Sequence, residues 1–136
     1  MTDENKTGAK DSPFVTDEDT FDVKINYYKD NKKIVVEGTD GFDDKKEKSS
    51  IVFTIRYPSQ ADCELIMQRA DSISRPGKEL DVSTLLKMEA IRFMILVKAW
   101  NIDKELNNDN IMDLHPDIVR RTLIKIREEI TTNGIF

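Results

Sequence analysis

Few side chains in this sequence are suited to catalysis. The chain of 136 residues has one histidine, His115, and one cysteine, Cys63. His115 directly precedes Pro116, and proline is favoured at the first position of a helix, so we interpret His115 as a helix cap or a surface residue. The sequence contains no Gly-x-Ser-x-Gly motif that would supply a nucleophile. We therefore expect no catalytic residue in this chain.

Cys63 falls in the first turn of a predicted helix, where the helix N-terminus favours a reactive thiolate. Its neighbours Asp62 and Glu64 are acidic, and their negative charges oppose that state. We interpret Cys63 as a small, partly buried helix residue. A single cysteine cannot form an intramolecular disulfide, which favours a reducing compartment, and with a single histidine it cannot complete a zinc site.

Three acidic residues occur in a glycine-containing loop, the kind of segment that binds calcium: Asp40, Asp43 and Asp44. The ligand order of an EF-hand loop is missing and lysines follow directly, so we interpret the segment as a solvated hairpin loop. Gly38 and Gly41 do not form a phosphate-binding motif. We expect no metal and no cofactor.

The negative charge is concentrated at the N-terminus. Residues 1–20 hold six acidic residues and two lysines, which accounts for four of the five net negative charges. This composition predicts an acidic flexible tail, because it offers too little apolar surface to offset the entropy of ordering. The net charge argues against nucleic-acid binding, and the longest apolar run, residues 93–97, is far too short to cross a membrane. The polar N-terminus shows no signal peptide.

Residues 21–136 are predicted to form a single α+β domain. Apolar and polar residues alternate over 21–27 and 51–57, which indicates half-buried strands, and the β-branched stretch 33–37 indicates another. Residues 21–57 are therefore predicted to be a small antiparallel β-meander of about three strands.

Residues 58–136 are predicted to contain three to four helices. Ser59 with Asp62 begins the first helix, and the sequence Arg75-Pro76-Gly77 ends it. The second helix begins at Asp81 or Ser83 and continues to about Trp100, a short helical turn covers 107–113, and the last helix covers 116–131. Strands followed by helices are typical of an α+β fold.

The second predicted helix is apolar on nearly every side in its second half, so it belongs to the core or also contacts a partner. The apolar candidates for partner binding are the apolar residues of 93–100, among them Phe93, Ile95, Val97 and Trp100, with Leu65, Ile66 and the apolar stripe of the last helix, Ile118, Val119, Leu123, Ile126 and Ile130. Each of them has the alternative of a purely structural role in the core. Arg121 and Lys125, one helical turn apart, suit phosphate or an acidic partner, although an ordinary solvated helix face is the favoured interpretation. The acidic tail of a neighbouring copy is a further candidate for that face.

Three segments occur in a characteristic order: Phe53-Thr54-Ile55-Arg56-Tyr57-Pro58 before a helix, then Ala99-Trp100-Asn101-Ile102 before a polar loop, then Asn110-Ile111-Met112-Asp113-Leu114 before the closing helix. This order resembles that of the small tail assembly chaperones of tailed bacteriophages. The resemblance covers residues 51–130, about the last two-thirds of the chain.

The resemblance implies a non-catalytic phage tail morphogenesis protein in the cytoplasm of the infected bacterial host. Such chaperones coat the tape measure protein, recruit tail tube proteins and self-associate, so the partners would be other phage tail proteins. A groove that accepts a helix would shield the apolar stripes of a long amphipathic helix. The alternative is a structural component of the virion, such as a baseplate, neck or tail adaptor protein. An enzyme or regulator that uses Cys63 or His115 ranks last.

Overall fold

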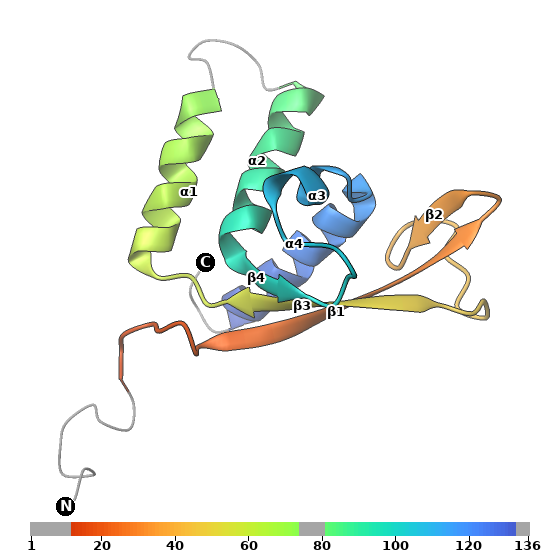
Figure 1. Cartoon of the computed structure of the whole chain (residues 1–136), viewed down its shortest axis with the longest axis horizontal. Helices are drawn as coiled ribbons and strands as arrows, with labels where there is room; N and C mark the ends of the chain where they lie inside the picture. The colour runs from red at the N-terminus through yellow and green to blue at the C-terminus, as the bar shows by residue number, and fades with distance from the viewer. Residues whose placement is uncertain (1–11, 74–80, 133–136) are drawn as a thin grey trace, which may run out of the picture.

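A four-stranded antiparallel sheet carries all the described helices on one of its faces in the computed structural model, which describes residues 12–73 and 81–132 (Figure 1). The strand order is β2-β1-β3-β4. The strands are β1 (Thr20–Asp30), β2 (Lys33–Val36), β3 (Ser49–Arg56) and β4 (Val97–Trp100). The helices are α1 (Gln60–Ile73), α2 (Val82–Leu96), α3 (Asn108–Met112) and α4 (Pro116–Thr132). The predicted α+β fold class is confirmed.

The long strand β1 lies at the centre of the sheet, so the strand order differs from that of a meander. A two-residue turn at Asn31 and Lys32, both with positive φ, leads into β2, as in a tight hairpin. β2 pairs only with the second part of β1, whereas β3 pairs with its first part, from Thr20 to Tyr27. β1 has 11 residues, so its first part can pair with β3 along one edge while its second part pairs with β2 along the other edge.

The second predicted helix ends earlier than expected. α2 ends at Leu96, and Val97 to Trp100 form the edge strand β4 in place of a last helical turn. Val97 has an extended backbone, with φ −84° and ψ 116°, although its N–H still donates to the carbonyl of Phe93. β4 pairs with β3 across an irregularity at Thr54 and Ile55. An apolar run is compatible with either a buried helix or a buried strand. Residues 97–100 form a strand because they pair with the edge of β3.

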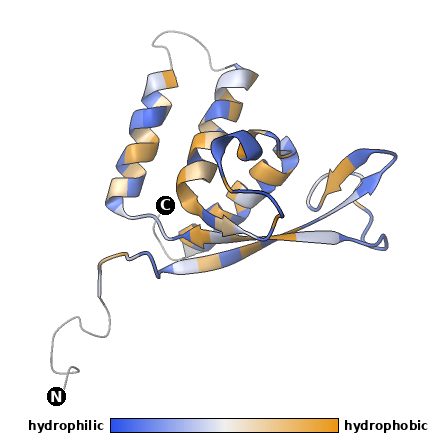
Figure 2. Ribbon diagram, in the orientation of Figure 1, coloured by the Kyte–Doolittle hydropathy of each residue, from blue (hydrophilic) through white to orange (hydrophobic). Residues whose placement is uncertain are grey.

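The core lies between the sheet and the helices. Alternate residues of β1 and β3 point toward the helices, and Figure 2 shows hydrophobic and hydrophilic residues alternating along the chain. Phe53 of β3 meets Phe93 of α2 edge to face, with ring centroids 5.3 Å apart. Other buried core residues are Val23, Ile25, Val36, Ile51, Ile55, Leu96, Val97, Ile111, Ile118, Ile126 and Ile130.

The opposite face of the sheet is polar. Thr54 Oγ1 donates to Asp22 Oδ1 at 3.1 Å, and Ser50 Oγ donates to Asn26 Oδ1 at 2.7 Å, so β3 and β1 are also joined through their outward side chains. Such cross-strand pairs stabilise a sheet face that contacts water.

Helix caps bear out several sequence predictions. Ser59 Oγ accepts a hydrogen bond from the N–H of Asp62, and Asp62 Oδ2 accepts one from the N–H of Ser59, which is a reciprocal capping box. Asp81, rather than Ser83, caps α2 through the N–H of Thr84. His115 caps α4, since its Nδ1 accepts from the N–H of Asp117 at 3.1 Å.

Parts of other predictions lie outside the described residues. These are the stop signal Arg75-Pro76-Gly77 after α1 and residues 1–11 of the predicted tail. The described part of that tail, residues 12–19, leads directly into β1 at Thr20.

Candidate functional site

A groove of about 550 Å³ lies between α1, α2 and α4. Its lining residues are Cys63, Ile66 and Met67 of α1, Glu89, Arg92 and Leu96 of α2, and Arg120, Leu123, Ile124, Ile126, Arg127, Ile130 and Thr131 of α4. We call this feature the α1–α4 groove. It exists because α2 packs against both α1 and α4, whereas α1 and α4 have few direct contacts with each other.

The inner part of the groove is apolar. Ile126, Ile130 and Leu96 are buried residues of the core, and Ile66 and Leu123 pack against them. The groove is thus a place where the core comes close to the surface between two helices. Pockets of this volume with apolar linings are typical binding sites.

Two large apolar side chains lie exposed on the two sides of the groove. Met67 on α1 is 65% exposed, and Ile124 on α4 is 41% exposed. A single exposed apolar residue is common on protein surfaces, but two of them beside an apolar groove enlarge one continuous apolar surface. Covering that surface would stabilise a complex.

Three arginines add positive charge to the groove. Arg120 Nε lies 3.4 Å from Glu89 Oε2, and Arg120 Nη1 lies 3.8 Å from Asp117 Oδ1, so its charge is partly compensated. Arg92 and Arg127 form no ion pair with another described residue. An apolar groove with two guanidinium groups outside the ion pairs of the described residues suits a segment that combines apolar and acidic side chains.

The predicted apolar partner-binding residues occupy different places. Phe93 and Val97 are buried in the core and have almost no surface to offer a partner. Trp100 packs against Phe53, and its indole Nε1–H donates to the carbonyl of Lys104 at 2.8 Å.

Three further apolar predictions, Ile95, Leu65 and Ile66, are half-buried. Of these three residues, only Ile66 lines the groove, together with Leu123, Ile126 and Ile130 of the predicted α4 stripe.

The predicted basic pair lies on another side of α4. Lys125 contacts the carboxylate of Glu37 and donates to the carbonyl of Lys24 at 2.7 Å. The guanidinium group of Arg121 lies beside Gly38. Both side chains therefore join α4 to the β1–β2 hairpin and the loop that follows it, and neither lines the α1–α4 groove.

Several residues of the groove were not proposed for partner binding from the sequence, among them Met67, Arg92, Ile124 and Arg127. One signal was present, because Ile124 is an apolar residue on α4 outside the stripe of Ile118, Val119, Leu123, Ile126 and Ile130. A second apolar position beside a complete stripe indicates more apolar surface than the core requires.

No family model, curated protein or solved structure matches this chain.

Residues 12–73 and 81–132 contain no group of three or more His, Cys, Asp or Glu side chains placed to hold a metal ion. In the same ranges no helix has the length and apolar character needed to cross a membrane. Cys63 is half-buried at the groove, and His115 is engaged as the cap of α4.

Proposed function

We propose that this chain is a non-catalytic phage tail morphogenesis protein, an assembly chaperone whose α1–α4 groove binds an amphipathic helix of the tape measure or tail tube proteins. The observation that carries the proposal is the groove itself, with exposed Met67 and Ile124 on its two sides. A helix laid into the groove would cover both side chains at once.

The energetics favour such a complex. Burying a large apolar side chain contributes about 1.5–3 kcal/mol, so Met67, Ile124 and matching residues of a partner helix together supply a useful part of a binding energy. The same contacts would keep the apolar stripe of the partner helix out of water before the tail is complete. This is the physical task of a chaperone for a long amphipathic helix.

The resemblance to tail assembly chaperones supports the proposal because its segments frame the groove. The motif that ends in Tyr57-Pro58 leads directly into α1, and the segment before His115 leads into α4. Both helices that form the two sides of the groove therefore belong to the span that resembles the family.

The binding experiment uses the full chain co-expressed with a tape measure or tail tube protein. We expect Met67→Glu and Ile124→Glu each to abolish co-purification, because a charge would then lie against the apolar stripe of the helix. Val82→Glu is the matched control, since Val82 is 72% exposed on α2 and lies outside the groove. Equal binding by all three variants would contradict the proposed site.

A second experiment separates the chaperone from a structural component of the virion. Mass spectrometry compares finished particles with the lysate of infected cells. A chaperone is abundant in the cytoplasm of the host and absent from particles. A fixed number of copies in particles would instead identify a baseplate, neck or tail adaptor protein, and the chaperone proposal would fail.

A further inference from the structure

The face of α4 that lines the α1–α4 groove places an exposed apolar side chain between two arginines. Ile124, which is 41% exposed, lies four residues after Arg120 and three residues before Arg127. Residues three or four apart share one face of a helix, so the three side chains form one row along α4. Arg120 and Arg127 are seven residues apart, which is about 10 Å along the helix. A partner that covers Ile124 therefore comes close to both guanidinium groups.

The middle helix adds a third arginine to the groove. Glu89, Arg92 and Leu96 of α2 line it at spacings of three and four residues, so they also share one helix face. Leu96 is buried in the core, whereas Arg92 is exposed. The residues that α1 contributes include no acidic or basic side chain. The charged residues that line the groove are thus three arginines and one glutamate.

Only part of this positive charge is balanced by neighbouring carboxylates. Glu89 Oε2 lies 3.4 Å from Arg120 Nε, and Asp117 Oδ1 lies 3.8 Å from Arg120 Nη1. Arg92 and Arg127 form no ion pair with any residue of 12–73 or 81–132. The chain as a whole has a net charge of −5, so the charge of the groove lining is opposite in sign to that of the protein.

The positions of these arginines limit which helix can cover the apolar surface of the groove. A helix that shields Met67 and Ile124 also removes water from the arginines in the row of Ile124. Taking a charged group out of water without a partner costs free energy. A carboxylate on the helix offsets this cost with a charge-assisted hydrogen bond, whereas a lysine or arginine adds repulsion.

We propose that the α1–α4 groove is selective for an acidic amphipathic helix, and that Arg92 and Arg127 are the residues that select it. The apolar stripe of this helix contacts Met67 and Ile124, and aspartate or glutamate side chains beside the stripe pair with the two guanidinium groups. The inference rests on the proposed function, because it takes the groove as a helix-binding site. It deepens that function by assigning a charge to the partner.

The test measures the binding of two synthetic peptides to the full chain by fluorescence anisotropy at low salt. The α4 residues that line the groove extend from Arg120 to Thr131, or about 16 Å, so peptides of about four helical turns are long enough. Both peptides carry the same leucine stripe and a covalent link on the opposite face that keeps them helical. One has glutamates beside the stripe, and the other has lysines at the same positions.

We expect the glutamate peptide to bind at least about tenfold more tightly than the lysine peptide, since two arginines attract the first and repel the second. The difference should shrink at high salt, because salt screens exposed charges. Equal affinities at low salt would overturn the inference, as would a wild-type chain that binds neither peptide.

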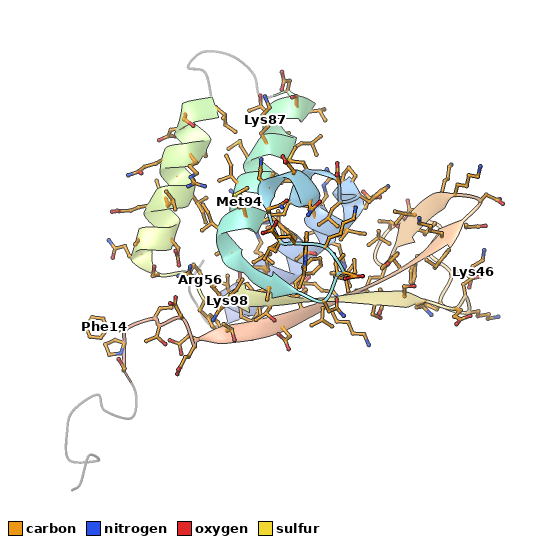
Figure 3. The ribbon with its side chains drawn as sticks, viewed as in Figure 1. Phe14, Lys46, Arg56, Lys87, Met94 and Lys98 are labelled. Atoms are coloured by element: carbon orange, nitrogen blue, oxygen red, sulfur yellow. The ribbon has the colours of Figure 1, made fainter. Side chains whose placement is uncertain are left out.

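Charge reversal identifies the residues that select the peptide. In the double variant Arg92→Glu/Arg127→Glu we expect the preference to reverse in favour of the lysine peptide. Misfolding cannot produce this result, because a misfolded chain would lose both peptides. Arg69→Glu on α1 and Lys87→Glu on α2 are controls that should keep the wild-type preference, since both residues are exposed and lie outside the groove. Figure 3 shows Lys87 on the half of α2 that is farther from the sheet. A double variant that still prefers the glutamate peptide would contradict the assignment.

The selectivity and the proposed function fail separately. If both peptides bind equally and Met67→Glu abolishes co-purification with the tail protein, the proposed function stands and the selectivity for acidic helices is wrong. If the glutamate peptide is preferred through Arg92 and Arg127 but no tail protein co-purifies, the selectivity is correct and the role in tail assembly fails.

Discussion

The ammonium group of Lys125 on α4 lies against the carboxylate of Glu37, the residue that follows β2, and so ties the last helix to the hairpin. The same ammonium donates to the carbonyl of Lys24 at 2.7 Å, and Glu37 also accepts from Asn26 Nδ2 at 3.2 Å. Burial acts to raise the pKa of Glu37, but the hydrogen bond and charge of Lys125, aided by Asn26, outweigh it and lower that pKa.

Replacing Lys125 should destabilise the fold. In Lys125→Met the half-buried carboxylate of Glu37 loses its cation, and we expect the free energy of unfolding to fall by about 1–3 kcal/mol. Urea denaturation followed by the fluorescence of Trp100 measures this change. The double variant Lys125→Met/Glu37→Gln should recover part of the loss. A double variant as unstable as the sum of both single variants would contradict a direct pairing.

The lowered pKa of Glu37 also predicts how stability depends on pH. Its folded pKa lies below the ordinary value of 4.5, so in this region the unfolded chain binds more protons than the folded one. The contribution of Glu37 is therefore complete above pH 4.5 and is lost as the pH falls through the folded pKa. We expect Glu37→Gln to lose stability less steeply below pH 4.5 than the wild type in thermal unfolding. Identical slopes would show that Glu37 is not responsible.

Two glycines in one loop offer a matched comparison. Gly38 and Gly41 both have positive φ, of 83° and 87°, so alanine is strained at either position. A Cβ at Gly38 would lie 2.8 Å from Cζ of Arg121, whereas a Cβ at Gly41 would have no neighbour within 4 Å. We expect Gly41→Ala to cost about 1 kcal/mol and Gly38→Ala somewhat more. The difference should disappear when Arg121 is also replaced by alanine, and chemical denaturation of the four variants measures it.

Phe93 and Met67 should respond in opposite ways to truncation. Phe93 is fully buried against Phe53, so Phe93→Ala should lower the free energy of unfolding by about 3–5 kcal/mol. Met67 is mostly exposed, so Met67→Ala should change stability by no more than about 0.5 kcal/mol while weakening partner binding. Thermal melts and the co-purification experiment report these two effects independently. A stable Phe93→Ala variant would contradict the core position of that ring.

Local patterns in the sequence predicted most of the elements. The alternation in 21–27 and 51–57 corresponds to β1 and β3, because period two leaves one face of a strand for the core. The capping pair Ser59 and Asp62 correctly marked the start of α1, since a cap needs only residues three positions apart. Charge and hydropathy likewise depend on composition alone.

Local sequence patterns predicted only part of the candidate site. Apolar periodicity marks residues that avoid water, but it does not say which of them a neighbouring helix covers. Phe93 and Met67 are both apolar helix residues, and only the placement of α1, α2 and α4 buries the first and exposes the second. Of the predicted partner-binding residues, the fold brings Ile66 and the α4 stripe residues Leu123, Ile126 and Ile130 to the groove.

The sequence by itself determined the fold class, the two long strands and the starts of the helices, because hydrophobic period and capping act over a few neighbouring residues. The tertiary structure decided the central place of β1, the conversion of 97–100 into β4, and the α1–α4 groove. These features depend on contacts between distant segments. The backbone of residues 97–100 becomes a strand because β3 offers hydrogen-bonding groups at its edge, and the groove exists because α1 and α4 both pack on α2.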